Sequence, residues 1–219
     1  MGKLIVIEGL DGSGKGTQST RLADYLRLKG QKVRLIDFPR YENESSLFVR
    51  MYLGGALGDS PDDTGAYAAS MLFAADRYVS YRTDWKRDVD DPNTVVIANR
   101  YTTANAYHQI AKLPRECWDD YLSWLWDFEF SRLDLPTPDA VIGLTMPPAV
   151  SRALVEKRCA EQGIVKDIHE ADEGYLARCY EALQYVAKKM GWTLIDCSDG
   201  ESILPIPVIE EKIHRALSL

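Results

Sequence analysis

Short apolar runs rich in β-branched residues alternate along this chain with longer segments in which apolar residues recur every three or four positions. The short runs predict strands at residues 4–7, 32–37, 94–98, 140–145 and 193–196. The longer segments predict helices at residues 17–29, 64–85, 116–132, 148–160 and 173–190. Because strands that alternate with helices pair in parallel, we expect an α/β fold with a five-stranded parallel sheet flanked by helices. The charged stretch at residues 84–93 is expected to be a solvated turn.

The first strand leads directly into a glycine-rich segment that opens a helix. Its spacing, Gly9-x4-Gly14-Lys15, allows a compact loop whose backbone N–H groups point at phosphate oxygens, and the lysine adds a positive charge. The N-terminal end of the following helix favours the same anion. A glycine-rich turn that binds nothing is the plainer alternative, but the order of strand, loop and helix favours a phosphate-binding loop.

This loop departs from the strict phosphate-loop pattern at one position. The strict pattern places Ser or Thr directly after the lysine, where its hydroxyl binds Mg²⁺. Here Gly16 follows Lys15, and Thr17 comes one residue later. The pattern therefore leaves open whether the loop itself contacts a metal ion.

Further polar and aromatic residues follow the next two predicted strands. Phe38-Pro39-Arg40-Tyr41 comes after the second strand and Asn99-Arg100-Tyr101 after the third. In open parallel sheets, ligands bind beyond the carboxyl ends of the strands. We therefore expect these residues to line the same edge of the sheet as the phosphate-binding loop.

Length and charge narrow the class of protein further. The chain has 219 residues and a formal net charge of −7, which suits a single domain over residues 1–219 that buries roughly 70% of its unfolded surface. Nucleic acids and membrane surfaces bind basic faces, so neither is an expected partner. The four cysteines show no zinc or disulfide spacing, and no targeting segment or membrane-length apolar run is seen. We expect a cytoplasmic protein.

A phosphate-binding loop alone fits a GTPase, a motor ATPase or a small-molecule kinase. The Asn-Lys-x-Asp motif that is usual in GTPases is absent, and the third strand runs into Asn99 where a motor ATPase places an acidic residue for Mg²⁺. A kinase that joins two polyanions needs arginines around a second anion pocket. Arg40, Arg77 and Arg100 could supply those positive charges.

Five segments, taken in order, closely resemble those of thymidylate kinases, and the resemblance extends over most of the chain. They are EGLDGSGKGTQ at 8–18, FPRY at 38–41, LFAADR at 72–77, NRY at 99–101 and LPTPD at 135–139. The resemblance implies a three-layer P-loop NTPase fold and transfer of the γ-phosphoryl group of ATP to thymidine 5′-monophosphate (dTMP), with Mg²⁺ as cofactor. Such enzymes are usually homodimers.

The resemblance also implies roles for the residues that face the triphosphate. The implied ATP-binding residues are Gly9, Gly12, Ser13, Gly14, Lys15, Gly16 and Thr17, and the implied catalytic residues are Asp11, Lys15, Arg100 and Arg158. Asp11 matches a loop carboxylate near the 3′-hydroxyl of the acceptor sugar. Arg40 and Arg100 match positions that hold the monophosphate and the reacting phosphoryl group, which suits the planar guanidinium. The plainer alternatives are a turn-forming aspartate and solvated surface arginines.

For the acceptor base, the resemblance implies that Phe73 stacks on thymine and that Arg77, one helical turn later, reaches its carbonyl edge. Asn105 would meet the base, and Tyr107 would lie beside the sugar and disfavour a ribose 2′-hydroxyl. The full implied set of substrate-binding residues is Asp11, Phe38, Pro39, Arg40, Tyr41, Phe73, Arg77, Arg100, Asn105 and Tyr107. Without the resemblance, Phe73 is better interpreted as a core aromatic residue. Tyr41 and Tyr107 could each simply bridge core and surface.

Two departures from the family pattern concern the metal ion and the transferring group. The implied metal residues are Thr17 and Asn99, but the family usually has Asp at the latter position, and an amide offers Mg²⁺ no negative charge. Gly12 stands where some relatives carry a loop arginine that others supply from a lid. The candidate lid is about residues 157–170, in which Arg158, or alternatively Lys166, would neutralise the transferring phosphoryl group.

Two other functions stay open at this point. One is a kinase for another deoxynucleotide or for a deoxynucleoside; the latter needs a general base after the second strand, where Phe38-Pro39-Arg40 offers a cation instead. The other is a nucleotide-binding homologue that has lost catalysis, which Gly16 and Asn99 suggest and the arginines disfavour. The three histidines, His108, His169 and His214, are not expected to form a cluster and are assigned no metal or base role.

Overall fold

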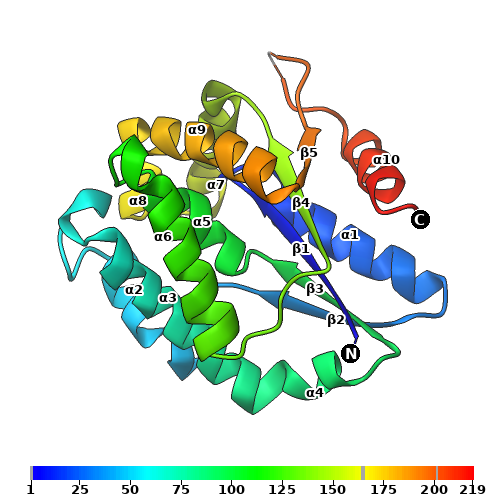
Figure 1. Cartoon of the computed structure of the whole chain (residues 1–219). Coiled ribbons are helices and arrows are strands. Elements are labelled where there is room, and N and C mark those ends of the chain that lie inside the picture. Colours follow the sequence, from blue (N-terminus) through cyan, green and yellow to red (C-terminus); the bar gives the residue numbers. More distant parts are fainter. Residues whose placement is uncertain (1, 164–165, 201) are drawn as a thin grey trace.

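The computed structural model describes residues 2–163, 166–200 and 202–219. Its centre is a sheet of five parallel strands in the order β2-β3-β1-β4-β5, with helices on both faces (Figure 1). The strands are β1 (Lys3–Gly9), β2 (Lys32–Asp37), β3 (Thr94–Asn99), β4 (Ala140–Thr145) and β5 (Thr193–Asp196). All five predicted strands and the predicted fold class are therefore confirmed.

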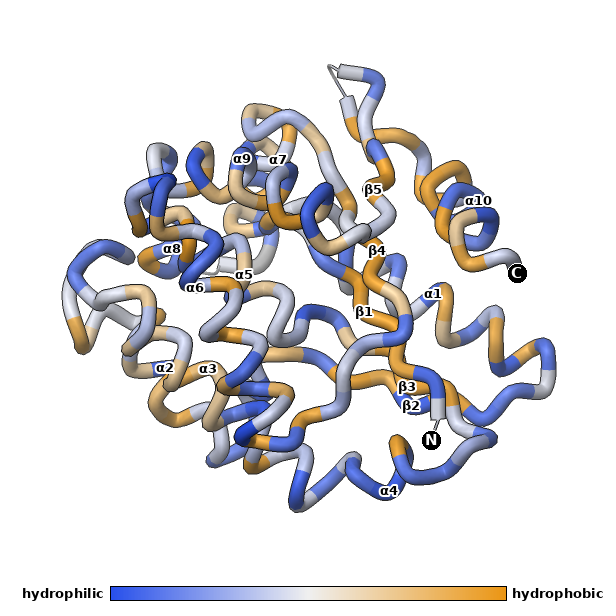
Figure 2. Tube along the Cα trace, in the orientation of Figure 1, coloured by the Kyte–Doolittle hydropathy of each residue, from blue (hydrophilic) through white to orange (hydrophobic). Residues whose placement is uncertain are grey.

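The central strand β1 explains why these runs are almost continuously apolar. Ile5 and Ile7 pack on one face of the sheet, and Leu4 and Val6 pack on the other. Because both faces are covered by helices, neither set of alternating residues is left for polar side chains. Strands β1 and β4 accordingly form an apolar centre of the chain trace in Figure 2, whereas the edge strand β2 also carries charged residues.

Helices α1 (Lys15–Leu28) and α10 (Ile206–Ala216) cover the first face. Leu22 and Leu26 of α1 and Ile209 of α10 join one apolar cluster against the sheet. The sequence did not predict α10, because two prolines, Pro205 and Pro207, flank its first residue. Both lie in the cap and first turn, where a proline removes no intrahelical hydrogen bond.

The second face carries most of the remaining helices, which are α2 (Leu47–Leu53), α3 (Ala66–Ser80), α5 (Thr102–Ile110), α6 (Trp118–Trp126) and α9 (Glu173–Met190). Helix α5 packs against α3, α6 and α9. It was not predicted, because eight of its nine residues are buried and it has no polar face to create a helical pattern.

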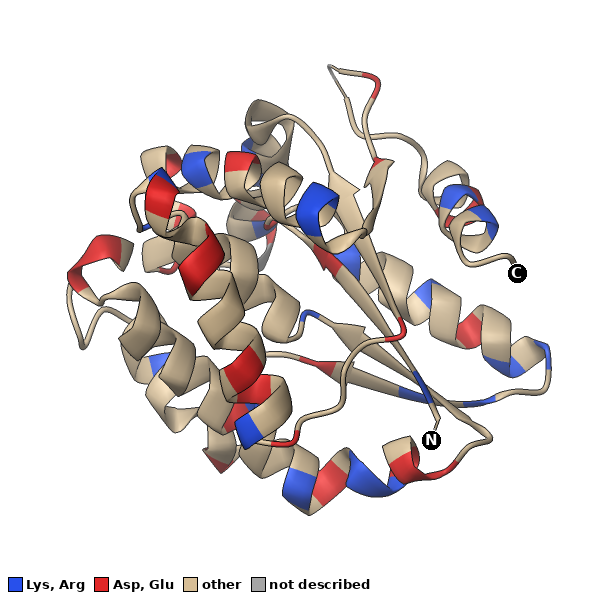
Figure 3. Ribbon diagram, viewed as in Figure 1, with Lys and Arg blue, Asp and Glu red and all other residues tan. Residues whose placement is uncertain are grey.

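Two π-helical turns, η3 (Tyr81–Trp85) and η5 (Asp127–Arg132), extend α3 and α6, and the helix α4 (Lys86–Asp90) follows the first of them. The prediction of a solvated turn at residues 84–93 was therefore wrong. Trp85 and Val89 are buried in the core, so the segment is an amphipathic helix with its charges outside. The charged side of α4 is seen in Figure 3.

Helices α7 (Pro148–Gln162) and α8 (Ile168–Ala171) border the carboxyl edge of the sheet, and short 3₁₀ turns occur at η1 (Glu44–Ser46), η2 (Pro61–Asp63) and η4 (Arg115–Cys117). Residues 164 and 165 of the predicted lid lie outside the described residues. In the part of the chain that is described, no helix combines the length and the apolar character needed to cross a membrane.

The connections of the sheet create the crevice in which a ligand can bind. Strands β1 and β3 are neighbours, but β1 leads to α1 on one face and β3 leads to α5 on the other. The loops after β1 and β3 therefore face each other across the switch point of the sheet.

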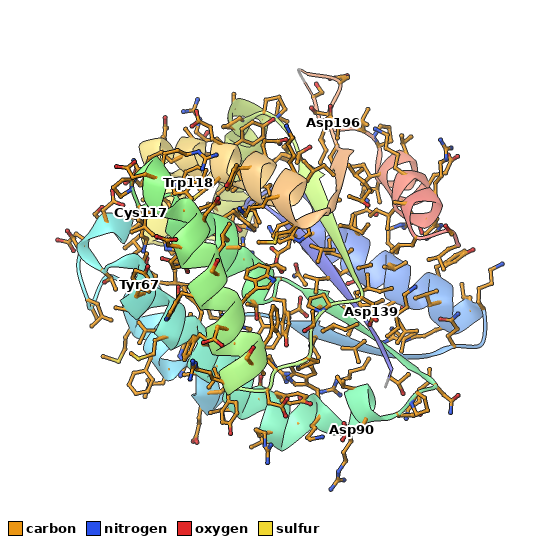
Figure 4. The ribbon with its side chains drawn as sticks, viewed as in Figure 1. Tyr67, Asp90, Cys117, Trp118, Asp139 and Asp196 are labelled. Atoms are coloured by element: carbon orange, nitrogen blue, oxygen red, sulfur yellow. The ribbon has the colours of Figure 1, made fainter. Side chains whose placement is uncertain are left out.

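At the opposite edge of the sheet, Asp139 holds the start of β1. Its carboxylate accepts a 2.7 Å hydrogen bond from Leu4 N, and the residue is labelled in Figure 4.

Candidate functional site

The loop between β1 and α1 has the backbone geometry of an anion cradle. Gly12 and Gly14 adopt φ values of 80° and 82°, which L side chains rarely allow, and Gly14 caps α1. The first N–H groups of α1 have no intrahelical acceptor, so they point into the space in front of the helix. The predicted phosphate-binding loop thus has the shape that its function requires.

Close packing gives a second reason for glycine at two loop positions, Gly9 and Gly12. A Cβ at Gly9 would lie 2.5 Å from Leu144 O, and one at Gly12 would lie 2.6 Å from Ser151 O on α7. A Cβ at Gly14 would meet nothing within 4 Å. The loop is therefore pressed against β4 and α7 on one side and open on the other, where a phosphate would enter.

Lys15, the first residue of α1, lies beneath this opening and is nearly buried. Its Nζ donates a 2.8 Å hydrogen bond to Leu10 O and lies 3.8 Å from Asp11 Oδ1. Burial and the repulsion of Arg100 lower the pKa of Lys15 to about 7, although Asp11 and Glu8 oppose this change. An arriving polyphosphate would favour the charged lysine.

Asp11 and Arg100 join the ends of β1 and β3. Arg100 has a φ of 64°, which is rare for a residue with a side chain, and its guanidinium donates to Asp11 Oδ1. Burial alone would raise the pKa of Asp11, but Arg100 and Lys15 hold it well below its usual range. Both groups are therefore charged at neutral pH. The carboxylate of Asp11 occupies the place beside Arg100 that a phosphate would take.

Two pockets open on either side of this pair, and five residues belong to both: Asp11, Phe38, Pro39, Arg100 and Asp167. The larger pocket lies over the loop and includes Lys15, Thr17 and Asn99. The smaller one lies between α3 and α5 and includes Phe73, Arg77 and Asn105. Residues that the sequence places far apart are thus brought to two adjoining pockets, with Arg100 between them.

Phe73 and Arg77 face the smaller pocket from the same side of α3, as their i,i+4 spacing predicts. Phe73 packs edge-on against Tyr52, with ring centroids 5.9 Å apart. Arg77 is only 2% exposed, so its charge needs a buried partner.

Glu129 on η5 is that partner, and the sequence did not identify it. Arg77 Nε and Nη2 donate to Glu129 at 2.7 and 2.5 Å, and the hydroxyl of Thr102 donates to the same carboxylate at 2.7 Å. Asn105 Nδ2 adds a 3.3 Å hydrogen bond. Burial opposes the charge of Arg77, but Glu129 raises its pKa overall. The available signal was an acid between two phenylalanines in WLWDFEF, although that segment holds a second acid, Asp127, which is exposed.

Tyr107 is not where the sequence placed it, because it does not line the smaller pocket. Its hydroxyl lies 2.9 Å from Glu8 Oε2 and 3.0 Å from Gly9 O. The carboxylate of Glu8 also accepts hydrogen bonds from Tyr101 N and from the hydroxyl of Thr103. Tyr107 and Glu8 therefore fasten the end of β1 to the start of α5.

His108 occupies the pocket wall instead, together with Gln109 and His169. The expectation that the histidines lie apart was wrong for two of them, since His108 and His169 stack with ring centroids 5.4 Å apart. Burial and the neighbouring His169 lower the pKa of His108 well below its usual value, and burial lowers that of His169 to about 3. Both rings are neutral at pH 7, so neither is a charged group of the site.

Arg40 does not line either pocket. Its backbone N–H donates to Asp76 at 2.8 Å, and its guanidinium donates to Asp84 at 2.8 Å, where Arg34 also binds. Arg40 Nη1 is buried without a hydrogen-bond partner among the described residues. The guanidinium would have to leave Asp84 before it could meet a phosphate.

Three residues of the candidate lid, Arg158, Asp167 and Glu170, line the larger pocket. Arg158 of α7 lines it and donates to Glu170 of α8, whereas Lys166 lies 3.5 Å from Glu156. Asp167 caps α8 and faces both pockets, and burial raises its pKa to about 6. Of the two candidate cations, Arg158 is therefore the one in the pocket wall, while Lys166 does not line it.

Oxygen-bearing side chains lie near the loop where a metal ion would accompany a triphosphate. Thr17 and Asn99 line the larger pocket, and so does Asp37, which the sequence did not suggest. Asn99 Oδ1 is buried without a partner among the described residues. A carboxylate, a hydroxyl and an unpartnered amide oxygen are hard ligands of the kind that Mg²⁺ and its waters prefer, so this set fits that ion.

Comparisons with known proteins agree with this geometry. The sequence profile of the family described as "Thymidylate kinase" matches residues 7–204. The thymidylate kinase of Mycobacterium tuberculosis is 34% identical over 177 residues, which cover 77% of this chain and 78% of that protein. The thymidylate kinase of Arabidopsis thaliana is 26% identical over 225 residues, which cover 99% of this chain and 71% of that protein.

A solved structure of a thymidylate kinase from Candida albicans shares the fold. It superposes with a TM-score of 0.68 and 22% identity and covers 99% of this chain and 91% of its own. The profile match spans most of the chain and includes the phosphate-binding loop and all the residues that line the two pockets. This chain belongs to the thymidylate kinase family.

Proposed function

We propose that this chain transfers the γ-phosphoryl group of ATP to dTMP and forms ADP and thymidine diphosphate. The observation that carries the proposal is the pair of adjoining pockets that share Asp11 and Arg100. One pocket has the backbone cradle of a triphosphate site, and the other has an aromatic ring and a fixed guanidinium suited to a pyrimidine base. Family membership supports the same reaction.

In the smaller pocket, thymine would stack on Phe73, accept a hydrogen bond from Arg77 and meet the amide of Asn105. The N–H groups of that amide already bind Ser70 O and Glu129. Glu129 holds Arg77 before any ligand arrives, so little side-chain ordering is left for the binding step. His108 and Gln109 complete the wall, and both carry buried polar atoms without a partner among the described residues. Such atoms are candidates for contacts with the base or the sugar.

The chemical step would need no general base. An oxygen of the dTMP phosphate is already an anion at neutral pH, so it attacks the γ-phosphorus while the bond to the β-phosphate oxygen of ADP breaks. Lys15 would balance charge on the donor phosphates, and Arg100 would exchange Asp11 for the phosphates that meet between the pockets. Alignment of the two substrates supplies most of the rate enhancement in such a site.

Mg²⁺ would join this site with ATP, near Thr17 and Asn99. When bound, it neutralises charge on the phosphate oxygens. Arg158, at the pocket rim, would add a further positive charge if residues 157–170 act as a lid. Arg40 stays a candidate for the monophosphate, on the condition that it exchanges Asp84 for that ligand.

Chain assembly and location are part of the same proposal, with residues 1–219 acting as one kinase domain, as a homodimer, in the cytoplasm. Apolar side chains that are 37–54% exposed gather on α2 and α3: Leu47, Phe48, Met51, Tyr67, Met71, Tyr78 and Val79. Exposed apolar side chains on two neighbouring helices are typical of a subunit interface. The four free cysteines suit a reducing compartment.

The test is ADP release from ATP and Mg²⁺ with a panel of nucleoside monophosphates and free thymidine. We expect fast turnover on dTMP and at least tenfold lower kcat/KM on the other monophosphates. Turnover on thymidine alone would indicate a nucleoside kinase, and no turnover on any acceptor would indicate a binding protein. Either result would contradict the proposal.

A further inference from the structure

The negative charge that the end of β3 lacks is present one strand away. Asn99 ends β3, and its partner in the register of the sheet is Asp37, the last residue of β2. The two side chains are joined by a 2.7 Å hydrogen bond from Asn99 Nδ2 to Asp37 Oδ1. The acid and the amide therefore form one unit at the edge of the sheet that faces the loop.

This unit lies against the start of α1. A Cβ on Gly16 would be 3.6 Å from Asn99 Nδ2, so the amide sits directly over the residue that follows Lys15. Asp37, Asn99 and Thr17 all line the larger pocket with Lys15. A triphosphate held by the loop would bring its metal ion into the same space.

The hydrogen bond also fixes the orientation of both side chains. Because Asn99 donates its amide N–H, its oxygen faces elsewhere, and this Oδ1 is buried with no partner among the described residues. Among the same residues, Asp37 takes part in no ion pair, since the nearby Arg34 and Arg40 bind Asp84 and Asp88. One full negative charge and one free amide oxygen thus remain available to a cation and its waters.

We propose that Asp37, oriented by Asn99, is the carboxylate through which this chain holds the Mg²⁺ that accompanies ATP. In this chain the acid lies at the end of β2 and not at the end of β3, and Asn99 lies between the acid and the loop. The inference rests on the proposed function, because it needs ATP on the loop side. It makes Asp37 a metal-site residue and Asn99 the residue that positions it.

The alternative role for Asp37 is that of a general base for a hydroxyl acceptor. Asp37 lines the larger pocket but not the smaller one that would hold a nucleoside. A base must lie within hydrogen-bond reach of the proton that it removes. The placement of Asp37 thus favours the metal ion over the acceptor.

The test compares Asp37→Asn, the exchange Asp37→Asn/Asn99→Asp and a matched control, Asp24→Asn, which removes an exposed acid of α1. Isothermal titration measures the binding of a non-hydrolysable ATP analogue with Mg²⁺ and with a chelator instead. Electron paramagnetic resonance of Mn²⁺ then measures the metal affinity of the analogue complex. The melting temperature of each variant shows whether it is folded.

We expect Asp37→Asn to weaken Mg²⁺-dependent binding and Mn²⁺ affinity at least tenfold, while chelator-treated binding stays equal or becomes tighter because a negative charge is lost. The exchange should restore metal-dependent binding to within about threefold, and Asp24→Asn should change neither quantity.

Unchanged metal dependence in Asp37→Asn, or equal losses with and without metal, would overturn the inference. So would an exchange variant that stays as weak as Asp37→Asn. Wild-type turnover on dTMP, measured in parallel, separates these outcomes from a failure of the proposed function, because it does not depend on which residue holds the metal ion.

Discussion

The two pockets are built by different means. The phosphate-binding part of the larger pocket, residues 11–17, is a backbone loop and a helix N-terminus from one continuous segment, with open space in front of Gly14. The smaller pocket is lined mainly by side chains from α3 and α5, and its guanidinium is buried and already hydrogen-bonded to Glu129 of η5. The first can accept any polyphosphate, whereas the second is shaped before its ligand arrives.

This difference has a physical basis in what each pocket must recognise. Phosphate oxygens are alike in every nucleoside triphosphate, so main-chain N–H groups and one lysine suffice. A base is recognised by a few polar groups in fixed positions, and a buried charged pair such as Arg77 and Glu129 keeps its geometry because breaking it is costly. Asp11 and Arg100 lie where the two pockets meet, and the contact between them must change when both ligands are present.

The largest expected effect is on the donor side. Lys15→Ala should lower kcat by about 10³-fold, because it removes a preorganised charge from the developing charge on the phosphates. The binding of dTMP should change by less than threefold, since Lys15 does not line the smaller pocket. Steady-state kinetics and dTMP titration check both values, and Lys188→Ala on α9 is the matched control. A comparable loss of dTMP binding would contradict the separation of the pockets.

In the smaller pocket, a substitution of Glu129 should weaken both the stability of the chain and the binding of dTMP. Glu129→Gln leaves Arg77 buried without a counter-ion, so we expect a loss of about 3 kcal/mol in the free energy of unfolding. The KM for dTMP should rise at least tenfold while the affinity for ATP stays within twofold. Urea unfolding and kinetics provide the measurements.

A second variant separates binding from stability at this site. Arg77→Met/Glu129→Leu removes both charges, so it should regain most of the stability and none of the dTMP affinity. Recovery of dTMP binding in this variant would show that the charged pair serves only the fold.

A smaller effect should appear in the pH dependence of ATP binding. With a folded-state pKa of about 7, Lys15 loses its proton above that pH, whereas the unfolded chain keeps it until about 10.5. The unfolded state then binds more protons, so this residue makes stability rise between pH 7 and 10.5. ATP should return the proton to Lys15.

Calorimetry at pH 8 in two buffers with different heats of ionisation measures that proton. We expect uptake approaching one proton per ATP in the wild type and almost none in Lys15→Met. Equal uptake in both proteins would place the titrating group elsewhere.

The smallest effect distinguishes two neighbours on α5. Tyr107→Phe should cost about 1 kcal/mol of stability through lost hydrogen bonds to Glu8 and Gly9, and the KM for dTMP should stay within twofold. His108→Ala should raise that KM several-fold, because His108 lines the pocket. The reverse order of effects on KM would restore Tyr107 as the residue beside the sugar.

The sequence predicted the donor side well because its signals are local. Every strand was predicted, and the loop was predicted from glycine spacing, since both depend on residues close together in the chain. Helix α5 was missed because burial on all sides removes the polar face that makes a helix visible in sequence. The helical turn at residues 84–93 was missed because its charges hide the buried Trp85 and Val89.

The acceptor side was only partly predictable because its contacts are long-range. Phe73 and Arg77 share a helix face and could be paired by spacing, but Glu129 lies 52 residues from Arg77. Asp37 and Asn99, 62 residues apart, meet only through strand register. Tyr107 and His108 differ by one position in the chain, and only the rotation of α5 decides which of them faces the pocket.

The central claim is that ATP and dTMP bind at once, in two pockets that meet at Arg100. A ligand that links adenosine and thymidine through a chain of phosphates tests it directly by calorimetry. We predict one ligand per chain, at least 100-fold tighter than either nucleotide alone, because the second contact becomes intramolecular. ATP alone and dTMP alone should each compete with the linked ligand for binding. A linked ligand that binds no tighter than ATP, or that leaves dTMP free to bind beside it, would contradict the account.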